Sequence, residues 1–271
     1  MIDEGEMDWR AYYLRDVYPR LNLPLAQYPL LSLDARAGDR PLGDFALVML
    51  VGLTGTGKST TLGLLRGTVD GLAGGVMPSR RELADWIAIP MAQALQGDPL
   101  APVSDRVRRF AYTRTFAEHV PGGMAAAFSW LRLADDFAGH VLTEGLRGRD
   151  EIGFALNRFP RWQIIELTLN PVTRLRRLSA RADDFDQTRG ADDLSFLPRG
   201  WRRAAAALFK TGEISSKALA IVRAEAANYG FEPFPGGLAY PNYHQVEVEG
   251  RSPDEVAAAL AGIIDEASCQ G

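Results

Sequence analysis

The sequence predicts an α/β fold: a three-layer α/β/α arrangement with a mostly parallel sheet of about five strands flanked by helices. Two observations carry this prediction. Apolar runs of strand length alternate along the chain with segments of helical spacing, the pattern of parallel strands joined by helical crossovers. The 271 residues are 46% hydrophobic, a composition typical of a globular core and sufficient for one large domain.

Each expected element rests on a local pattern. Phe45 to Val51 (FALVMLV) is an apolar run of strand length, and it predicts the first strand of the sheet. By the same criterion we expect strands at 45–51, 76–77, 140–143, 162–169 and 244–248. Helical spacing of apolar residues predicts helices at 9–18, 59–66, 81–95, 105–119, 122–137, 172–182, 201–228 and from 253 onward.

Prolines and glycines refine these helices. Pro90 lacks a backbone N–H, so it predicts a kink or a break in the third expected helix. Gly212 predicts a break near the middle of the long helix that follows residue 200. Ser252 caps the last helix, Pro253 suits its first position, and Glu255 completes a capping box.

Residues 1–44 differ from the rest of the chain. They contain four prolines and five aromatic residues, which favours an extended arm packing on the core through its aromatic side chains. An arm that binds a partner is the alternative. Residues 45–271 are expected to form the main domain, with 172–200 as a candidate lid and 201–242 as a helical insertion.

Charge and composition limit the classes of partner. The net charge of −4 does not suggest a broad nucleic-acid-binding surface. Cys269 is the single cysteine, so no disulfide can form within one chain. Residues 1–10 are acidic and do not resemble a signal peptide. No apolar run approaches the roughly 20 residues that span a bilayer. We therefore expect a soluble cytoplasmic protein that binds neither membrane nor nucleic acid.

The most specific motif is G-L-T-G-T-G-K-S at residues 52–59, which fits G-x-x-x-x-G-K-[ST] between an expected strand and an expected helix. Glycines let the backbone turn its N–H groups toward phosphate oxygens, and the helix N-terminus adds positive potential. Lys58 would reach the outer phosphates, and Ser59 would hold Mg²⁺. A chance glycine-rich turn is the alternative. The predicted nucleotide-binding residues are Gly52, Thr54, Gly55, Thr56, Gly57, Lys58, Ser59 and Thr60.

Glu144 ends the expected strand 140–143, and ligands in such sheets bind beyond the carboxyl ends of strands. Its carboxylate would act through Mg²⁺ or accept a proton from an attacking hydroxyl. The alternative is a structural cap beside a glycine turn.

Several arginines are candidates for binding phosphate. Arg80 and Arg147 follow expected strands, and Arg114 has the most enclosed neighbours among the arginines of helix 105–119. For Arg80, the solvated start of a helix is the alternative. Arg174, Arg177 and Arg181 recur at helical spacing and line one face with positive charge. A polyphosphate would explain that accumulation of like charge. Salt bridges to the acidic residues 183–186 are the alternative.

Together these segments resemble the P-loop NTPase kinases that act on nucleotides, the thymidylate kinase family most closely. The resemblance covers roughly 45–186 and 243–266 and rests on five motifs in the family's order: Gly52–Thr60, Ser79–Glu82 (SRRE), Ala111–His119 (AYTRTFAEH), Glu144–Arg147 (EGLR) and Arg176–Asp186 (RRLSARADDFD). It implies Mg²⁺ and ATP as cofactors, with Lys58, Glu144, Arg177 and Arg181 in catalysis. It also implies that Arg80, Arg114 and Arg147 bind the acceptor phosphate.

The chain departs from the family at the acceptor motifs. Glu144 stands where the family has an aspartate, Leu146 separates it from Arg147, and no proline follows the SRRE segment. The Glu-Gly pair is similar to that of uridine kinases, which phosphorylate a hydroxyl. The arm and residues 187–242 have no family counterpart.

Three hypotheses follow. The first is a cytosolic MgATP-dependent phosphotransferase acting on a nucleotide or another small phosphorylated acceptor. The second is a kinase of a small-molecule hydroxyl with Glu144 as the base. The third is a regulatory P-loop ATPase without a small acceptor. The sequence does not identify the acceptor. It also does not distinguish ATP from GTP as the donor, or a monomer from a homodimer.

Overall fold

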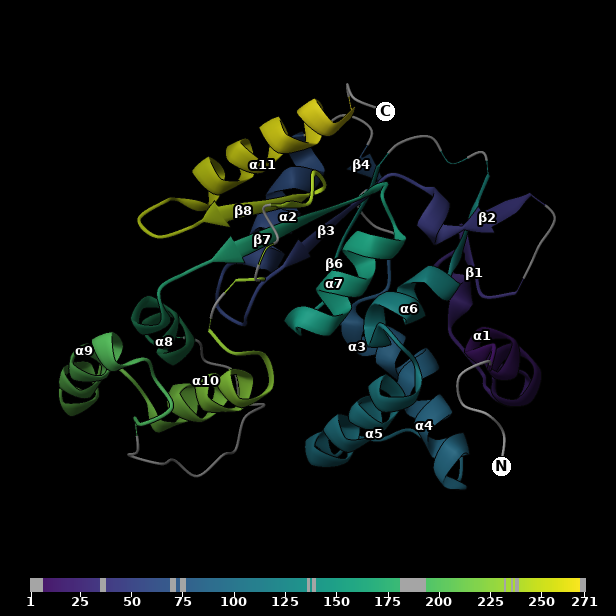
Figure 1. Cartoon of the computed structure of the whole chain (residues 1–271), viewed down its shortest axis with the longest axis horizontal. Helices are drawn as coiled ribbons and strands as arrows, with labels where there is room; N and C mark the ends of the chain where they lie inside the picture. Colours follow the sequence, from purple (N-terminus) through teal and green to yellow (C-terminus); the bar gives the residue numbers. More distant parts are fainter. Residues whose placement is uncertain are drawn as a thin grey trace. The chain divides into compact units, whose positions relative to one another are not determined.

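The computed structural model describes residues 7–34, 38–68, 72–73, 77–135, 137, 140–180, 194–231, 233–234, 236 and 239–268 (Figure 1). The chain divides into two compact units. Unit 1 comprises Met1–Met49, Val69–Leu146 and Asp150–Ile164, and unit 2 comprises Leu50–Thr68, Arg147–Arg149 and Ile165–Gly271.

The main sheet has five strands in the order β4-β6-β3-β7-β8. In that order the strands are Leu72–Ala73, His140–Glu144, Leu47–Val51, Trp162–Thr168 and Tyr243–Glu247. β4 pairs in parallel with β6. Val248 N, just after β8, donates to Thr168 O at the end of β7 at 3.0 Å, so these two strands end together, as parallel neighbours do. The predicted α/β fold with a mostly parallel sheet of about five strands flanked by helices is confirmed.

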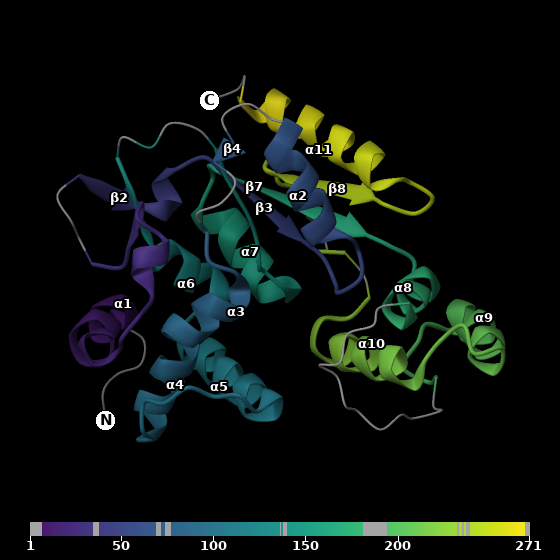
Figure 2. The same ribbon diagram turned by 180° about the vertical axis from the view of Figure 1, so that it is seen from behind.

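In unit 2, two helices pack on each other beside the sheet. They are α2 (Lys58–Thr68) and α11 (Pro253–Ser268), and Figure 2 shows them side by side. The predicted capping box of α11 is confirmed, because Ser252 N donates to Glu255 Oε2 at 2.7 Å and Glu255 N donates to Ser252 Oγ at 3.2 Å. The pattern satisfies N–H groups that have no partner inside a helix.

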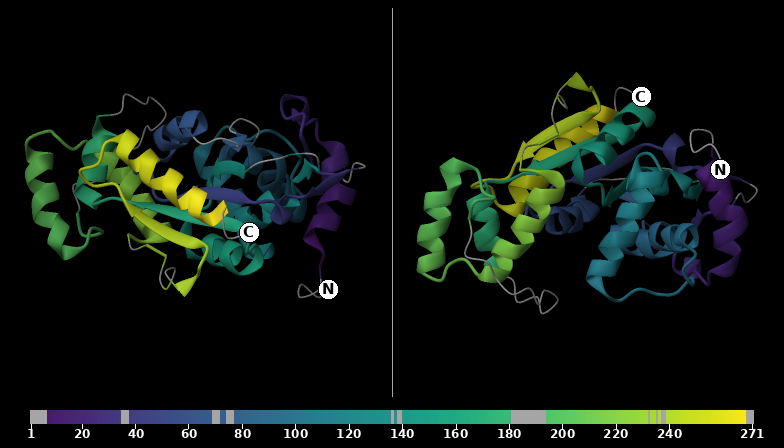
Figure 3. Two further views of the ribbon diagram at one scale, coloured as in Figure 1. Left: turned by 90° about the horizontal axis from the view of Figure 1, so that it is seen from above. Right: turned by 60° about the horizontal axis from the view of Figure 1, so that its bottom comes forward.

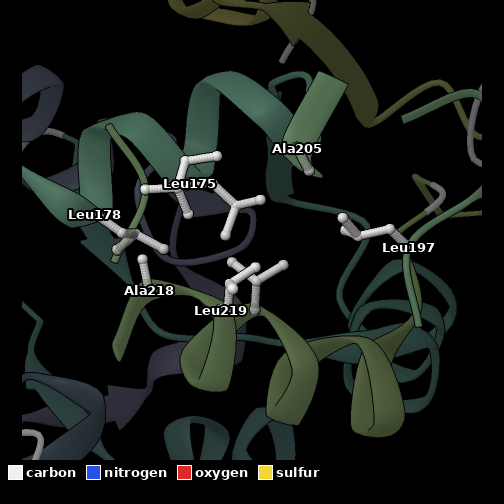
Figure 4. Packing of buried hydrophobic residues seen from close by; sticks show 8 residues of the cluster. Leu175, Leu178, Leu197, Ala205, Ala218 and Leu219 are labelled. Atoms are coloured by element: carbon white, nitrogen blue, oxygen red, sulfur yellow. The ribbon is translucent and has the colours of Figure 1, made fainter. Parts of the chain in front are cut away.

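Three further helices of unit 2 form a group of their own, called here the helical module: α8 (Pro171–Ser179), α9 (Arg199–Lys210) and α10 (Ser216–Tyr229). Figure 3 shows the three together in both of its views. The predicted break at Gly212 is confirmed, since Gly212 has φ +77° and lies between α9 and α10. Buried aliphatic side chains hold the module together (Figure 4), and they are Leu175, Leu178, Leu197, Ala205, Ile214, Ala218, Leu219 and Val222.

Unit 1 contains a run of packed helices: α3 (Arg80–Leu83), η5 (Ala84–Ala88), α4 (Ile89–Gln96), α5 (Arg106–His119), α6 (Gly123–Trp130) and most of α7 (Gly148–Arg158). The disturbance expected at Pro90 takes the form of a π-helical turn, η5, immediately before α4. A π turn changes the hydrogen-bond register, so it accommodates a residue that has no N–H to donate.

The arm also belongs to unit 1. It contains α1 (Trp9–Tyr12), a π turn η1 (Tyr13–Val17), and the 3₁₀ turns η2 (Tyr18–Arg20), η3 (Leu25–Gln27) and η4 (Leu42–Asp44). Trp9, Tyr13 and Val17 recur every four residues and are buried. The Tyr13 hydroxyl donates to Trp86 O at 2.8 Å, so an aromatic side chain of the arm is bound to the helices of the same unit.

Two strands of the arm pair with a strand from the middle of the chain. β1 (Leu31–Ser32) and β2 (Asp39–Pro41) lie antiparallel on either side of β5 (Arg132–Ala134). Leu133 is the register partner of both Leu31 and Arg40. This small sheet shows that the arm is part of the folded unit.

Two sequence expectations need correction, and one helix was not expected. The helix predicted over 122–137 is wrong beyond Trp130, because Leu131 is extended and the chain continues into β5. The strand expected at 76–77 is not seen at Met77, which is irregular, and residue 76 lies outside the described residues; β4 at Leu72–Ala73 pairs with β6 instead. Helix α7 was not expected from the sequence, although Ile152, Ala155 and Leu156 are buried at helical spacing within it.

Candidate functional site

The glycine-rich motif forms the connection between β3 and α2. All five residues of β3 are buried, so the strand anchors the start of the loop in the sheet. Gly52, Gly55 and Gly57 have φ of +133°, +92° and +99°, a region that side chains disfavour. A Cβ on Gly52 would lie 2.6 Å from Leu167 O. The spacing of glycines in the motif is therefore required by the path of the backbone.

Lys58 is the first residue of α2 and its ammonium group folds back over the loop. Its Nζ donates to Gly52 O at 2.8 Å and to Leu53 O at 3.1 Å. Ser59 and Thr60, the next residues of the helix, are exposed. The first N–H groups of a helix have no partner within it, so this end of α2 offers donors and positive potential to an anion.

Arg177 of α8 lies beside the loop. A Cβ placed on Gly57 would be 3.9 Å from Arg177 Nη1, in ordinary contact. Among the residues that the structure describes, none forms an ion pair with Arg177. Arg181 and the acidic stretch 183–186 lie outside the described residues. The structure thus brings one of the two expected lid arginines next to the loop.

The middle of the loop is held by an ion pair from the helical module. Arg174 of α8 and Glu225 of α10 form a salt bridge, and their residues are 1% and 7% exposed. Glu225 accepts from Thr54 N at 3.1 Å and from the Thr54 hydroxyl, and Arg174 Nε donates to Thr54 O at 3.1 Å. Burial lowers the pKa of Arg174, and the nearby Glu225 carboxylate only partly offsets this.

This ion pair was not predicted from the sequence. Helical spacing predicted that Arg174 and Arg177 share a face open to phosphate. Arg174 is instead buried, four residues before Leu178, on the side of α8 that faces the core of the helical module. A signal for Glu225 was present. It lies three residues after Val222 in a helix rich in alanine and apolar residues, at a position where helical spacing predicts burial. A buried carboxylate needs a charged or hydrogen-bonding partner.

Arg80 is engaged within unit 1. Its Nη1 and Nη2 donate to the two oxygens of Glu151 at 2.6 and 2.8 Å, and Nη1 also donates to Gly145 O. Glu151 accepts in addition from Met124 N at 3.4 Å. This bidentate pair joins α3, α7 and the start of α6, and it occupies the guanidinium that the sequence assigned to an acceptor phosphate.

The remaining candidates differ in exposure. Glu144 ends β6 and is half-buried, with its Oε2 atom shielded from solvent, and Arg147 is half-buried. Arg114 is exposed although Tyr112 and Phe116 are buried. The expectation of an enclosed Arg114 is therefore wrong, because residues 112 and 116 share one face of α5 and residue 114 lies away from it.

Within the described part of the chain, no group of three or more histidine, cysteine, aspartate or glutamate side chains gathers as a potential metal site. Of the described helices, not one has the length and hydropathy that crossing a bilayer requires.

Comparison with known proteins gave matches only among solved structures: no family model and no curated protein matches the chain. An unliganded sugar kinase from Janibacter sp. HTCC2649 has 14% identity and a TM-score of 0.38, with 82% of this chain and 95% of that chain covered. A gluconokinase from Sinorhizobium meliloti 1021 has 12% identity and a TM-score of 0.40, with 86% and 99% covered.

Proposed function

We propose that the protein is a MgATP-dependent phosphotransferase of the P-loop kinase type. One observation carries the proposal: a G-x-x-x-x-G-K-S loop whose three glycines all have positive φ joins a buried strand to a helix that begins at the motif lysine. Loop amides, a helix N-terminus and a lysine are the groups that bind a triphosphate in such folds.

The donor set of the loop fits the triphosphate and its metal. Lys58 would bind the outer phosphates, and Ser59 and Thr60 would offer their exposed hydroxyls to Mg²⁺ and phosphate. Arg177 stands beside Gly57 and would neutralise charge on the transferred group. Bound MgATP would supply the phosphoryl group itself. Arg181 is proposed for the same task as Arg177.

Two classes of acceptor are proposed. For a phosphorylated acceptor such as a nucleotide, Arg80, Arg114 and Arg147 would bind its phosphate and Glu144 would act through the metal. For a hydroxyl acceptor, Glu144 would hold the hydroxyl and take its proton. The bidentate Arg80–Glu151 pair favours the hydroxyl acceptor, because a phosphate would have to displace a carboxylate that already satisfies the guanidinium.

The proposal is tested first by nucleotide binding. In isothermal calorimetry with MgATP and MgGTP, Lys58→Ala should lose nearly all heat of binding, because the point charge on the outer phosphates is gone. Lys210→Ala is the matched control, since Lys210 is exposed on α9. Absence of binding to the unaltered protein, or unchanged binding by Lys58→Ala, would refute the proposal.

The acceptor is tested by a panel of nucleosides, nucleoside monophosphates and sugars in an ADP-release assay. Faster ADP release with one class identifies it. If a hydroxyl is the acceptor, Glu144→Gln should reduce kcat strongly while the affinity for MgATP persists. If no acceptor accelerates ADP release, the regulatory ATPase becomes the better description.

A further inference from the structure

Both backbone polar groups of Thr54, its N–H and its carbonyl, are hydrogen-bonded to side chains of the helical module. Its N–H and hydroxyl donate to Glu225 of α10, and its carbonyl accepts from Arg174 of α8. Thr54 is the third residue of the phosphate loop, yet the two side chains come from 120 and 171 residues away. The loop therefore takes part of its shape from the helical module.

The charges of this pair matter because of where it lies. A carboxylate bonded to a loop that is proposed to bind a triphosphate would repel the ligand. Arg174 forms a salt bridge with the same carboxylate, and both side chains are buried. Charges that are removed from water act more strongly on their surroundings than exposed charges do. The pair is neutral as a whole, whereas either member alone would leave a net charge beside the loop.

The pair is not needed simply to join α8 to α10. Leu175 and Leu178 of α8 already pack on Ala218, Leu219 and Val222 of α10. Such aliphatic contacts bring the two helices together without any hydrogen bond to the loop.

We propose that Arg174 and Glu225 are positioning residues that fix the phosphate loop through Thr54, and that Arg174 must neutralise the Glu225 carboxylate for the loop to accept a triphosphate. This inference rests on the proposed function. It adds that the helical module sets the affinity of the loop for its nucleotide, through two residues outside the motif.

The test compares the dissociation constant for MgATP among variants by calorimetry. Arg174→Met should weaken binding about 10- to 100-fold, because the Glu225 carboxylate is left unpaired next to the phosphates. Glu225→Gln should bind within about threefold of the unaltered protein, because glutamine still offers an acceptor to Thr54 and Arg174 stays positive. The double variant should recover most of the loss.

Two controls remove similar groups from the same module. Glu213→Gln breaks the exposed Arg176–Glu213 pair, and Arg203→Met removes an exposed arginine of α9. Neither should change the dissociation constant, because exposed charges are screened. Melting temperatures are recorded for all variants. A role confined to helix packing would lower the melting temperature of both single variants without separating their affinities, and that result would overturn the inference.

If Arg174→Met does not fold, the dissociation constant of Glu225→Asp for MgATP tests the inference instead. The shorter side chain keeps the negative charge but withdraws it from Thr54, so the dissociation constant should rise about tenfold. Unchanged affinity in that variant would overturn the inference. If the unaltered protein itself does not bind MgATP, the proposed function fails; if it binds and the variants behave like the controls, only the positioning role fails.

Discussion

At the scale of single residues, the loop shows how backbone geometry selects amino acids. Gly52 has φ +133°, and any side chain there meets Leu167 O. Gly63, five residues into α2 and exposed, has open space around it. The same residue type is thus required at one position and dispensable at the other.

The prediction at this scale is a pair of alanine variants. Gly52→Ala should lower the free energy of unfolding by roughly 1–3 kcal/mol and abolish MgATP binding, since the loop must shift. Gly63→Ala should raise the free energy of unfolding by about 0.5–1 kcal/mol, because alanine loses less backbone entropy in a helix. Chemical denaturation measures both. A stable, nucleotide-binding Gly52→Ala would contradict the backbone argument.

Whether a residue of the site was predictable from the sequence depends on how far away in the sequence its partners lie. The glycines and Lys58 were predictable because a local motif sets their geometry. The pairs Arg174–Glu225 and Arg80–Glu151 were not, because their members are 51 and 71 residues apart and no local spacing reports such a contact.

At the scale of elements, the best-predicted helix is α11, because a capping box in the sequence marks its first residues. Ser252 and Glu255 exchange hydrogen bonds at the start of α11. The donor N–H of Ser252, helped by its hydroxyl, lowers the pKa of Glu255. A carboxylate whose pKa is lower in the folded state stabilises the fold above its unfolded pKa, and that contribution is lost as the pH falls through the folded pKa.

The corresponding prediction concerns acid. Glu255→Gln should lower the melting temperature at pH 7, and the difference from the unaltered protein should shrink as the pH falls below about 4.3, the ordinary glutamate value. Thermal melts across pH 3–7 followed by circular dichroism give this profile. Glu247→Gln, an exposed residue of β8, serves as the control. A difference that persists undiminished at pH 3 would exclude the capping carboxylate as its source.

Other elements were missed for a shared reason. The segment 122–137 is apolar enough for a long helix, but its last part becomes β5 because two strands of the arm supply hydrogen-bond partners about one hundred residues away in sequence. β4 is only two residues long and is defined by its pairing with β6. Strand identity depends on non-local partners more than helix identity does.

At the scale of the whole molecule, the proposed ligand should stabilise the fold. A ligand that binds only the folded state adds RT ln(1 + [L]/Kd) to the free energy of unfolding. MgATP at one hundred times its Kd should therefore add about 2.7 kcal/mol, or roughly 5–10 °C in melting temperature for a chain of this size.

Differential scanning fluorimetry over a range of MgATP concentrations tests this expectation. The shift should grow with the logarithm of concentration and vanish in Lys58→Ala, while Lys210→Ala should shift as the unaltered protein does. An equal shift in Lys58→Ala would mean that the nucleotide binds somewhere other than the glycine loop.

The antiparallel ribbon formed by β1, β5 and β2 has a practical consequence for anyone shortening this chain. β5 is enclosed on both edges by residues that precede Phe45. A version starting at the glycine-loop strand would leave Arg132–Ala134 with two bare edges and would remove the Tyr13 hydroxyl that donates to Trp86 O. Unpaired edges recruit neighbouring molecules, so removing the residues before Phe45 invites aggregation.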